Sequence, residues 1–102
     1  MISIIVPCYN EQEALPFFHE EVSRVLKEIG EDYELLFVND GSKDDTLKEL
    51  KALSTKDPHV IYLSFSRNFG KEAAMYAGFC NAKGDYIAVM DADLQDPPAL
   101  LP

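Results

Sequence analysis

The stretch ELLFVNDGS, residues 34–42, decides the fold, because it joins a strand of the buried type to a turn. Residues 34–39 are β-rich and apolar almost throughout, which is typical of a strand covered on both faces of a parallel sheet. Asn39-Asp40-Gly41-Ser42 combines residues that favour turns. The stretch therefore predicts a strand that ends at Asn39 and a turn that leads into a helix.

Three more apolar, β-rich runs recur along the chain, at residues 3–7, 60–64 and 86–90. Helical patterns lie between them, so strands and helices alternate. This alternation predicts an α/β fold with an open, mainly parallel sheet and helices on both of its faces. In this chain the sheet would end after its fourth strand.

Each predicted helix has its own signal. From Ala14 to Ile29, apolar residues follow the i, i+3, i+4, i+7 spacing, and Gly30 is placed as a C-terminal stop. Ser42 with Asp45 resembles a capping box, which predicts that the second helix opens at Ser42. A thin face of small residues would let the third helix lie close against the sheet: Ala73, Ala74, Ala77 and Gly78.

Composition excludes several classes of function. The chain has 102 residues, 47% of them hydrophobic and 26% charged, which is typical of one small globular domain. Its formal charge of −9 argues against nucleic acid as a partner. Two cysteines are too few for a disulfide framework, so we expect reduced thiols in a cytoplasmic protein.

Membrane insertion is not expected of these residues, since no apolar run approaches the roughly 20 residues of a membrane helix. The chain ends at PALLP without a helix stop signal, and we expect it to be the leading part of a longer protein. An open sheet also leaves an unpaired edge, which makes a homo-oligomer plausible.

Polar segments follow all four predicted strands: PCYNE at 7–11, NDGS at 39–42, SRNFGK at 66–71 and DADLQD at 91–96. In open α/β sheets, ligands bind outside the carboxyl ends of the strands, where the strand order reverses. We therefore expect these four segments to converge on one ligand site. The first of them has no glycine-rich phosphate loop, which argues against nicotinamide cofactors and P-loop chemistry.

Asp91 and Asp93 stand one residue apart, so both carboxylates can face one side of an extended segment. Their mutual repulsion calls for a neutralising charge. Carboxylate oxygens favour hard cations such as Mg²⁺ or Mn²⁺, with water and phosphate completing the coordination, and the side-chain oxygen of Gln95 could join them. The alternative is that the pair only forms a loop and caps a helix.

Other strand-end residues carry two readings each. Asp40 is either a turn residue or an acceptor for a base or ribose. Tyr9 either packs or offers its ring to a nucleobase, and Glu11 either favours a helix N-terminus or contacts the ligand. Arg67 and Lys71 either lie in solvent or offset phosphate charge.

In order, SIIVPCYNEQEALP, LLFVNDGSKDDT and SRNFGKEAAMYAGFCNAKGDYIAVMDADLQDPP resemble the family 2 glycosyltransferases, and most closely those that act on polyprenyl phosphates such as dolichol and undecaprenyl phosphate. The resemblance covers almost the whole chain. It implies a Rossmann-like, nucleotide-sugar-binding fold of the GT-A type, of which residues 1–102 would be the N-terminal nucleotide-sugar-binding part.

The resemblance also implies roles for individual residues. Asp91, Ala92 and Asp93 would be the D-x-D motif that holds a metal and the diphosphate, with Gln95 as an additional ligand and Asp91 and Asp93 as the catalytic pair. The nucleotide pocket would be lined by Pro7, Tyr9, Glu11 and Asp40, with Lys71 as a further contact.

The implied reaction is inverting transfer of a sugar from a nucleotide diphosphate, UDP rather than GDP, to a polyprenyl phosphate at the cytoplasmic face of a membrane. A metal would stabilise the leaving diphosphate. The acceptor site of such enzymes follows later in the chain, so we expect these residues alone to show little or no transfer.

Two alternatives stay open at this stage. A phosphatase with an aspartyl nucleophile also uses D-x-D at a strand end, but there the motif follows the first strand rather than the fourth. A non-catalytic module that binds nucleotide and metal, or that serves assembly, would keep the same pocket. Loss of metal-dependent nucleotide binding on changing the motif would separate these readings.

Overall fold

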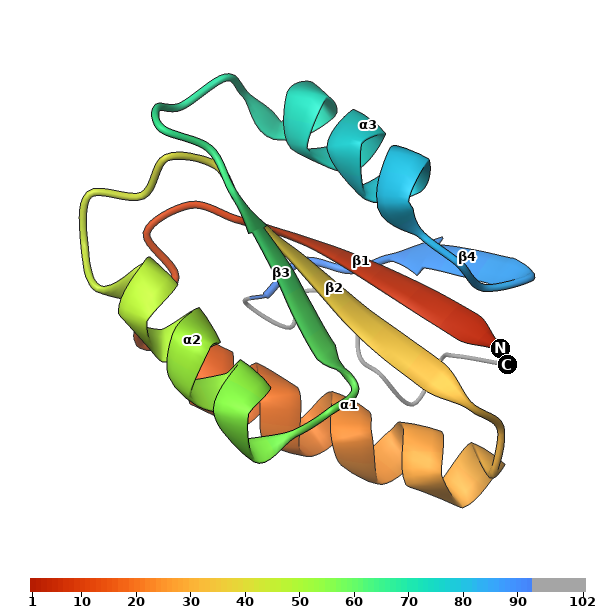
Figure 1. The fold of residues 1–102 in the computed structure, drawn as a ribbon. Coiled ribbons are helices and arrows are strands. Elements are labelled where there is room, and N and C mark those ends of the chain that lie inside the picture. The colour runs from red at the N-terminus through yellow and green to blue at the C-terminus, as the bar shows by residue number, and fades with distance from the viewer. Residues whose placement is uncertain (93–102) are drawn as a thin grey trace.

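In the computed structural model, residues 1–92 are described, and they form a four-stranded sheet flanked by three helices (Figure 1). The elements follow the expected alternation of strand and helix along the chain. Their bounds are β1 (Ile2–Cys8), α1 (Leu15–Ile29), β2 (Tyr33–Asn39), α2 (Thr46–Lys56), β3 (Val60–Ser64), α3 (Lys71–Asn81) and β4 (Tyr86–Val89).

All neighbouring strands are parallel, and their order across the sheet is β3-β2-β1-β4. The chain moves outward from β1 through β2 to β3, and α3 then carries it back so that β4 pairs with the free side of β1. The order therefore reverses between β1 and β4. In sheets of this type, that reversal opens a crevice at the carboxyl ends of the two strands.

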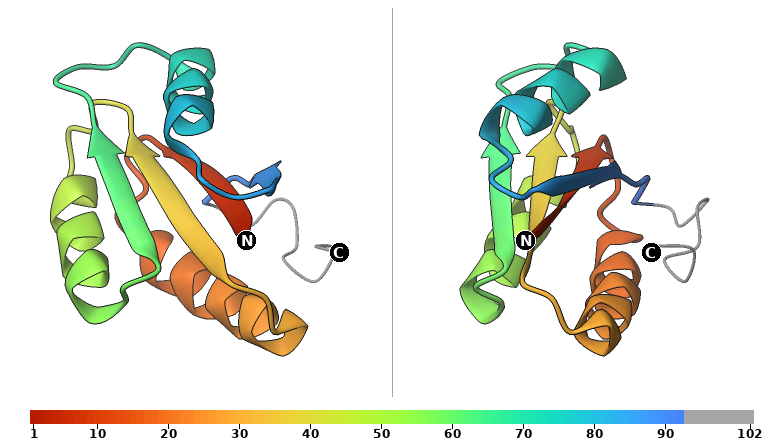
Figure 2. Two further views of the ribbon diagram at one scale, coloured as in Figure 1. Left: turned by 45° about the vertical axis from the view of Figure 1, so that its right-hand side comes forward. Right: turned by 90° about the vertical axis from the view of Figure 1, so that its right-hand side faces the viewer.

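Helices cover both faces of the sheet, as the sequence predicted. Figure 2 shows α3 on one side of the strands and α1 with α2 on the other. The main cluster of buried apolar side chains lies between the sheet and helices α1 and α2. There the rings of Phe18 and Phe37 meet edge to face, with 6.0 Å between their centroids. On the other face, a Cβ on Gly78 would stand 2.4 Å from Cγ2 of Ile5, so α3 approaches the sheet as closely as its predicted small-residue face allows.

The beginning of α2 differs from the prediction. The helix starts at Thr46 rather than at Ser42, and the Ser42 hydroxyl accepts the backbone N–H of Asn10 at 2.9 Å. Asp44 accepts the backbone N–H of Thr46 instead, at 3.0 Å. Gly30 ends α1 in the left-handed conformation with φ of +80°, as predicted, whereas α3 ends at Asn81, before the stop expected at Gly84.

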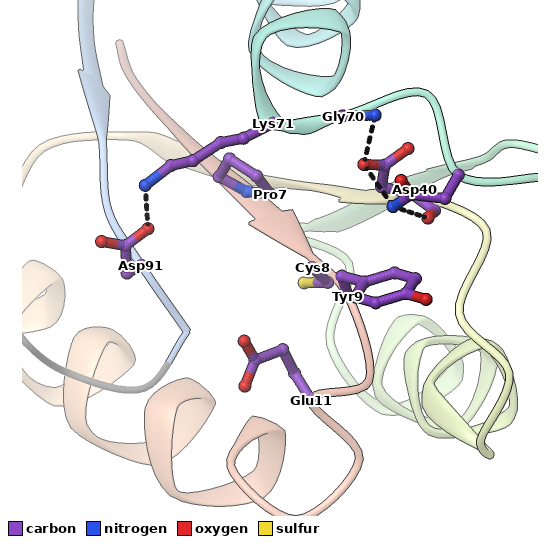
Figure 3. Close-up of a pocket in the computed structure, with 9 residues that line it drawn as sticks. Pro7, Cys8, Tyr9, Glu11, Asp40, Gly70, Lys71 and Asp91 are labelled. Atoms are coloured by element: carbon purple, nitrogen blue, oxygen red, sulfur yellow. Dashed lines mark hydrogen bonds and ion pairs between the residues drawn. The ribbon is translucent and has the colours of Figure 1, made fainter.

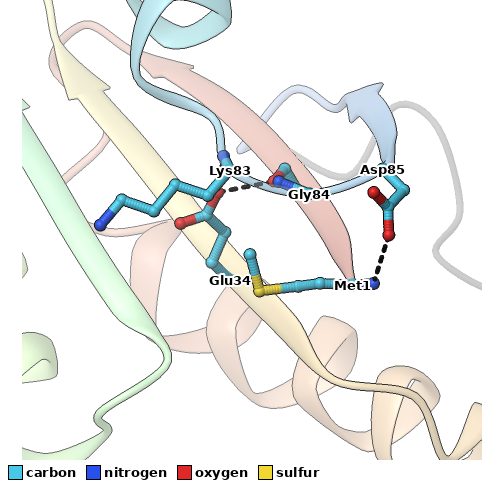
Figure 4. A network of polar contacts seen from close by, with 6 residues as sticks. Met1, Glu34, Lys83, Gly84 and Asp85 are labelled. Carbon is cyan, nitrogen blue, oxygen red and sulfur yellow. Dashed lines mark hydrogen bonds and ion pairs between the residues drawn. The ribbon is translucent and has the colours of Figure 1, made fainter.

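A buried carboxylate fixes the turn between α3 and β4 (Figure 4). Glu34 in β2 accepts the hydroxyl of Ser3 at 2.6 Å and the backbone N–H of Lys83 at 2.7 Å, while the Ser3 hydroxyl accepts the N–H of Gly84 at 2.8 Å. Because buried polar groups are costly without partners, this network holds the entrance to β4 in one place. It thereby positions the residues that follow β4.

A second polar cluster connects the end of α2 to α1 and to the starts of β2 and β3. Asp57, which follows α2, accepts the His19 ring N–H and the His59 backbone N–H at 2.8 and 2.9 Å, and the His59 ring stacks on Tyr33. Partial burial by itself raises the pKa of Asp57. The two hydrogen bonds and the attraction to both imidazole rings outweigh burial and lower that pKa below its ordinary value.

The depressed pKa of Asp57 predicts a pH-dependent part of the stability. A carboxyl group whose pKa is lower in the folded state stabilises the fold above its unfolded pKa, about 3.9, and loses that contribution as the pH falls through the folded value. Asp57→Asn should therefore lower the free energy of unfolding by about 1–3 kcal/mol at pH 7 and by less at pH 3.

Urea denaturation at both pH values measures this difference. Asp32→Asn, a change of an exposed carboxylate, is the control and should alter stability little at either pH. An effect of Asp57→Asn that stays constant from pH 7 to pH 3 would contradict the assigned role of the carboxylate charge.

Candidate functional site

A polar cavity of about 450 Å³ opens at the carboxyl edge of the sheet (Figure 3). Every strand end contributes to it, either directly or through the loop that follows. Its lining residues are Pro7, Cys8, Tyr9, Glu11, Asp40, Asn68, Gly70, Lys71 and Asp91. The predicted convergence of the four strand ends is thus confirmed, and the cavity lies at the crevice between β1 and β4.

The segment after β1 forms one wall of the cavity. Tyr9 is 41% exposed and lines the cavity, while Glu11 donates its backbone N–H to the Thr46 hydroxyl at 2.9 Å. Burial, and then the charge of Glu11, raise the pKa of the Cys8 thiol far above its ordinary value. Cys8 therefore stays protonated near neutral pH and does not act as a nucleophile here.

Asp40 occupies the end of β2 and is only 3% exposed. One of its carboxylate oxygens accepts the backbone N–H of Phe69 at 2.7 Å, and the other accepts the Asn68 amide and the backbone N–H of Gly70, each at 3.0 Å. A carboxylate has about four acceptor positions, so these bonds leave at most one for a ligand. Through these hydrogen bonds, Asp40 holds the loop that precedes α3 in place.

Gly41 makes the close approach of the loop before α3 sterically possible. Its φ is +67°, and a Cβ at this position would stand 2.1 Å from the carbonyl carbon of Arg67 and 2.3 Å from the nitrogen of Asn68. The turn predicted at 39–42 is therefore present, and its glycine is required by the close approach of another loop as well as by its backbone conformation.

Lys71 and Asp91 form an ion pair across the cavity. The Lys71 ammonium lies 2.8 Å from a carboxylate oxygen of Asp91, and the two side chains are 59% and 29% exposed. Figure 3 shows the lysine side chain extending from the start of α3 past Pro7 toward Asp91, which follows β4. The structure therefore brings two of the predicted site residues into direct contact, Lys71 from the start of α3 and Asp91 from the end of β4.

The remaining predicted residues are placed as follows. Ala92 is buried, and Asp93 and Gln95 lie outside the described residues, so their proposed metal-binding roles stay predictions. Within residues 1–92, no group of three or more His, Cys, Asp or Glu side chains is arranged to hold a metal ion. Arg67 packs its guanidinium over the ring of Phe69, at 4.8 Å, and is not among the residues that line the cavity.

Three lining residues, Cys8, Asn68 and Gly70, were not predicted from the sequence as site residues, and the last two lie in the segment after β3. Both belong to the SRNFGK segment, whose position after the third strand was the signal that could have found them. Their contribution depends on Asp40, which is far from them in the sequence.

An open parallel sheet with a polar cavity at its reversal point is the arrangement in which open α/β proteins bind their ligands. A family model described as "Glycosyl transferase family 2" matches residues 3–102. The chain belongs to this family.

Similar proteins carry related names. The chain is 52% identical to "Putative glycosyltransferase CsbB" of Bacillus subtilis and 48% identical to "Prophage bactoprenol glucosyl transferase homolog" of Escherichia coli, over 99% of its length in both cases. It is 42% identical to "Undecaprenyl-phosphate 4-deoxy-4-formamido-L-arabinose transferase" of Proteus mirabilis, again over 99% of its length. The chain spans about a third of each relative, 31%, 33% and 31% respectively.

Solved structures share the fold. The mannosyltransferase PcManGT of Pyrobaculum calidifontis, solved with GDP-Man and Mn²⁺, matches with a TM-score of 0.71, and S. aureus TarS 1-349, solved with UDP, matches with the same score. Each is 23% identical, and each match covers 90% of this chain and 27% of the other. Among the described residues of this chain, no helix is both long and apolar enough to cross a membrane.

Proposed function

We propose that the protein transfers a sugar from a nucleotide diphosphate sugar to a polyprenyl phosphate, with residues 1–102 as the nucleotide-sugar-binding part of the transferase domain. The observation that carries the proposal is the cavity at the crevice between β1 and β4, where Asp91 of the D-x-D motif faces Lys71. A relative named for undecaprenyl phosphate supports the lipid acceptor. UDP is the preferred nucleotide, and the reaction would take place at the cytoplasmic face of a membrane.

The cavity offers contacts that a nucleotide could use. It is open along the strand ends, and it places the exposed face of Tyr9 where a base could stack. Pro7 and Glu11 would line the same nucleotide pocket. The one acceptor position left on Asp40 would take a base N–H, while its other bonds hold the wall formed by residues 68–70.

Among the described residues, Asp91 is the cavity carboxylate proposed as a ligand for a divalent cation. Asp91 offers an oxygen ligand inside the cavity, and the ammonium of Lys71 beside it indicates that this carboxylate is balanced by positive charge. Asp91, with Asp93 and Gln95, would hold Mg²⁺ or Mn²⁺, and Ala92 would sit between the two carboxylates. A bound cation would supply positive charge to the diphosphate as it leaves.

The chemistry assigned to this chain is then mainly electrostatic. The cavity residues orient the donor so that the bond between the sugar and the diphosphate can break as the acceptor attacks from the opposite face, which inverts the sugar carbon. A lipid phosphate is already anionic near neutral pH, so the attack needs less help from a general base than attack by a sugar hydroxyl.

Calorimetric titration with UDP and with GDP, each with and without Mn²⁺, tests the proposal. We expect UDP to bind in the presence of Mn²⁺, and Asp91→Asn to weaken that binding by about tenfold or more, because the neutral amide is a much poorer ligand for a hard cation. Asp85→Asn is the control, since Asp85 is exposed and pairs only with the N-terminal ammonium among the described contacts.

Two results would contradict the transferase reading. Nucleotide binding that needs no metal and survives Asp91→Asn would favour the non-catalytic binding module. Absence of any nucleotide binding to the full chain would remove the basis for placing the donor in this cavity. Circular dichroism of each variant would show whether the fold is retained.

A further inference from the structure

We infer that Lys71 is an exchangeable counter-ion, which neutralises Asp91 until a divalent cation takes that carboxylate and then binds a phosphate of the nucleotide. The inference rests on the proposed function, because it concerns the same cation and the same donor. It adds that the cation and the nucleotide change each other's affinity, which neither the cavity nor the family membership implies.

The first observation is the position of the ion pair. Lys71 is the first residue of α3 and Asp91 follows β4, and both line the same cavity with 2.8 Å between the ammonium and the carboxylate. A cation that binds Asp91 would therefore lie close to the lysine ammonium and would be repelled by it (Figure 3). The two positive charges compete for one carboxylate.

The second observation is that this pair is accessible to solvent. The side chains of Lys71 and Asp91 are 59% and 29% exposed, and exposed ion pairs shift an equilibrium by no more than about fivefold. A divalent ion that also gains phosphate oxygens as ligands outcompetes a contact of this strength. The pair is thus strong enough to neutralise Asp91 and weak enough to open.

The third observation is that only the side chain of Lys71 has to move. The residue before it donates its backbone N–H to the buried carboxylate of Asp40 at 3.0 Å, and α3 packs closely on β1 through Gly78. The long stem of the lysine can turn while its backbone stays fixed. The displaced ammonium therefore remains in the cavity, where its three donors and compact charge suit a phosphate.

These observations together imply positive coupling between the two ligands. Cation binding releases Lys71 toward the nucleotide, and a phosphate that attracts Lys71 leaves Asp91 free for the cation. Because such coupling is reciprocal, each ligand must raise the affinity of the other by the same factor. The lysine would thus favour binding of the cation and the nucleotide together over binding of either alone.

Lys71→Met separates this role from an ordinary phosphate contact. In the full chain, Mn²⁺ affinity without nucleotide, measured by electron paramagnetic resonance, should rise about threefold, because the competing ammonium is gone. UDP affinity at saturating Mn²⁺, measured by calorimetry, should fall about tenfold, since a charged donor to the phosphate is lost. Lys71→Arg keeps the charge and should show the competition of the wild type.

Lys83→Met is the matched control. Lys83 is an exposed lysine at the other end of α3, it contacts Glu34 through its backbone N–H, and it does not line the cavity. The substitution changes the net charge by the same amount, so it should leave both affinities as in the wild type.

The outcomes distinguish this inference from the proposed function. If Mn²⁺ affinity is unchanged or lower in Lys71→Met while the wild type binds Mn²⁺ and UDP, the inference is wrong and the proposed function stands. An equal rise of the Mn²⁺ affinity in Lys83→Met would show that the effect comes from net charge alone, and it would also overturn the inference. A wild-type chain that binds neither Mn²⁺ nor UDP would overturn both.

Discussion

Replacing Gly41 with alanine is expected to lower the free energy of unfolding by about 3 kcal/mol or more, the largest loss from adding a single methyl group that the described residues indicate. The new Cβ would meet the backbone of Arg67 and Asn68 at 2.1 to 2.6 Å, and backbone atoms cannot turn aside as a flexible side chain can. The positive φ of +67° adds about 1 kcal/mol of strain. Urea denaturation measures the total.

Gly30→Ala separates the two contributions. Gly30 also has a positive φ, +80°, but a Cβ there would have nothing within 4 Å. Gly30→Ala should therefore lower the free energy of unfolding by about 1 kcal/mol, from backbone strain alone. If the two variants prove equally stable, the loop at 67–68 must yield easily, and the close approach would not explain the glycine at position 41.

Replacing Asp40 with alanine is expected to cost a further large amount, about 3 kcal/mol, and to release the loop before α3. The variant loses the acceptor of three hydrogen bonds and leaves the N–H groups of Phe69 and Gly70 without their partner. Amide hydrogen exchange at these two residues should become much faster, because it reports local opening directly. Nucleotide binding should weaken as well, since Lys71 follows the released segment.

Asp40→Asn is the conservative comparison. The asparagine keeps one acceptor oxygen, so it can hold one of the two backbone N–H groups, and its loss of stability should be about half that of alanine. Unchanged amide exchange at Phe69 and Gly70 in Asp40→Ala would show that the loop is held by other contacts. In that case the carboxylate would be kept chiefly for the ligand.

The strands and the gathering of their ends could be predicted from the sequence, because both follow from short-range patterns and a general rule of topology. Apolar runs placed β3 at residues 60–64 and the other strands to within a residue at each end. Parallel pairing then brings all carboxyl ends to one edge, where Tyr9, Asp40, Lys71 and Asp91 line one cavity.

Contacts between distant segments could not be predicted in the same way. Ser42 has the local signature of a helix cap, yet its hydroxyl binds the backbone of Asn10, and α2 begins later. Asp40 reads as a turn residue or a ligand contact, but its main partners belong to a loop 28 to 30 positions further on. Each of these partners is chosen by the folded structure, on which local sequence carries little information.

The pairing of β4 with β1 has a consequence for how the protein is made. β1 is the first strand to be synthesised and β4 the last of the described strands, and their residues pair from Ile2 with Tyr86 onward. Contacts so distant along the chain form late and slowly, because a large loop must close first. One side of β1 therefore stays unpaired on the ribosome until residues 86–89 emerge, and Asp91 takes its place in the cavity only after β4 has paired with β1.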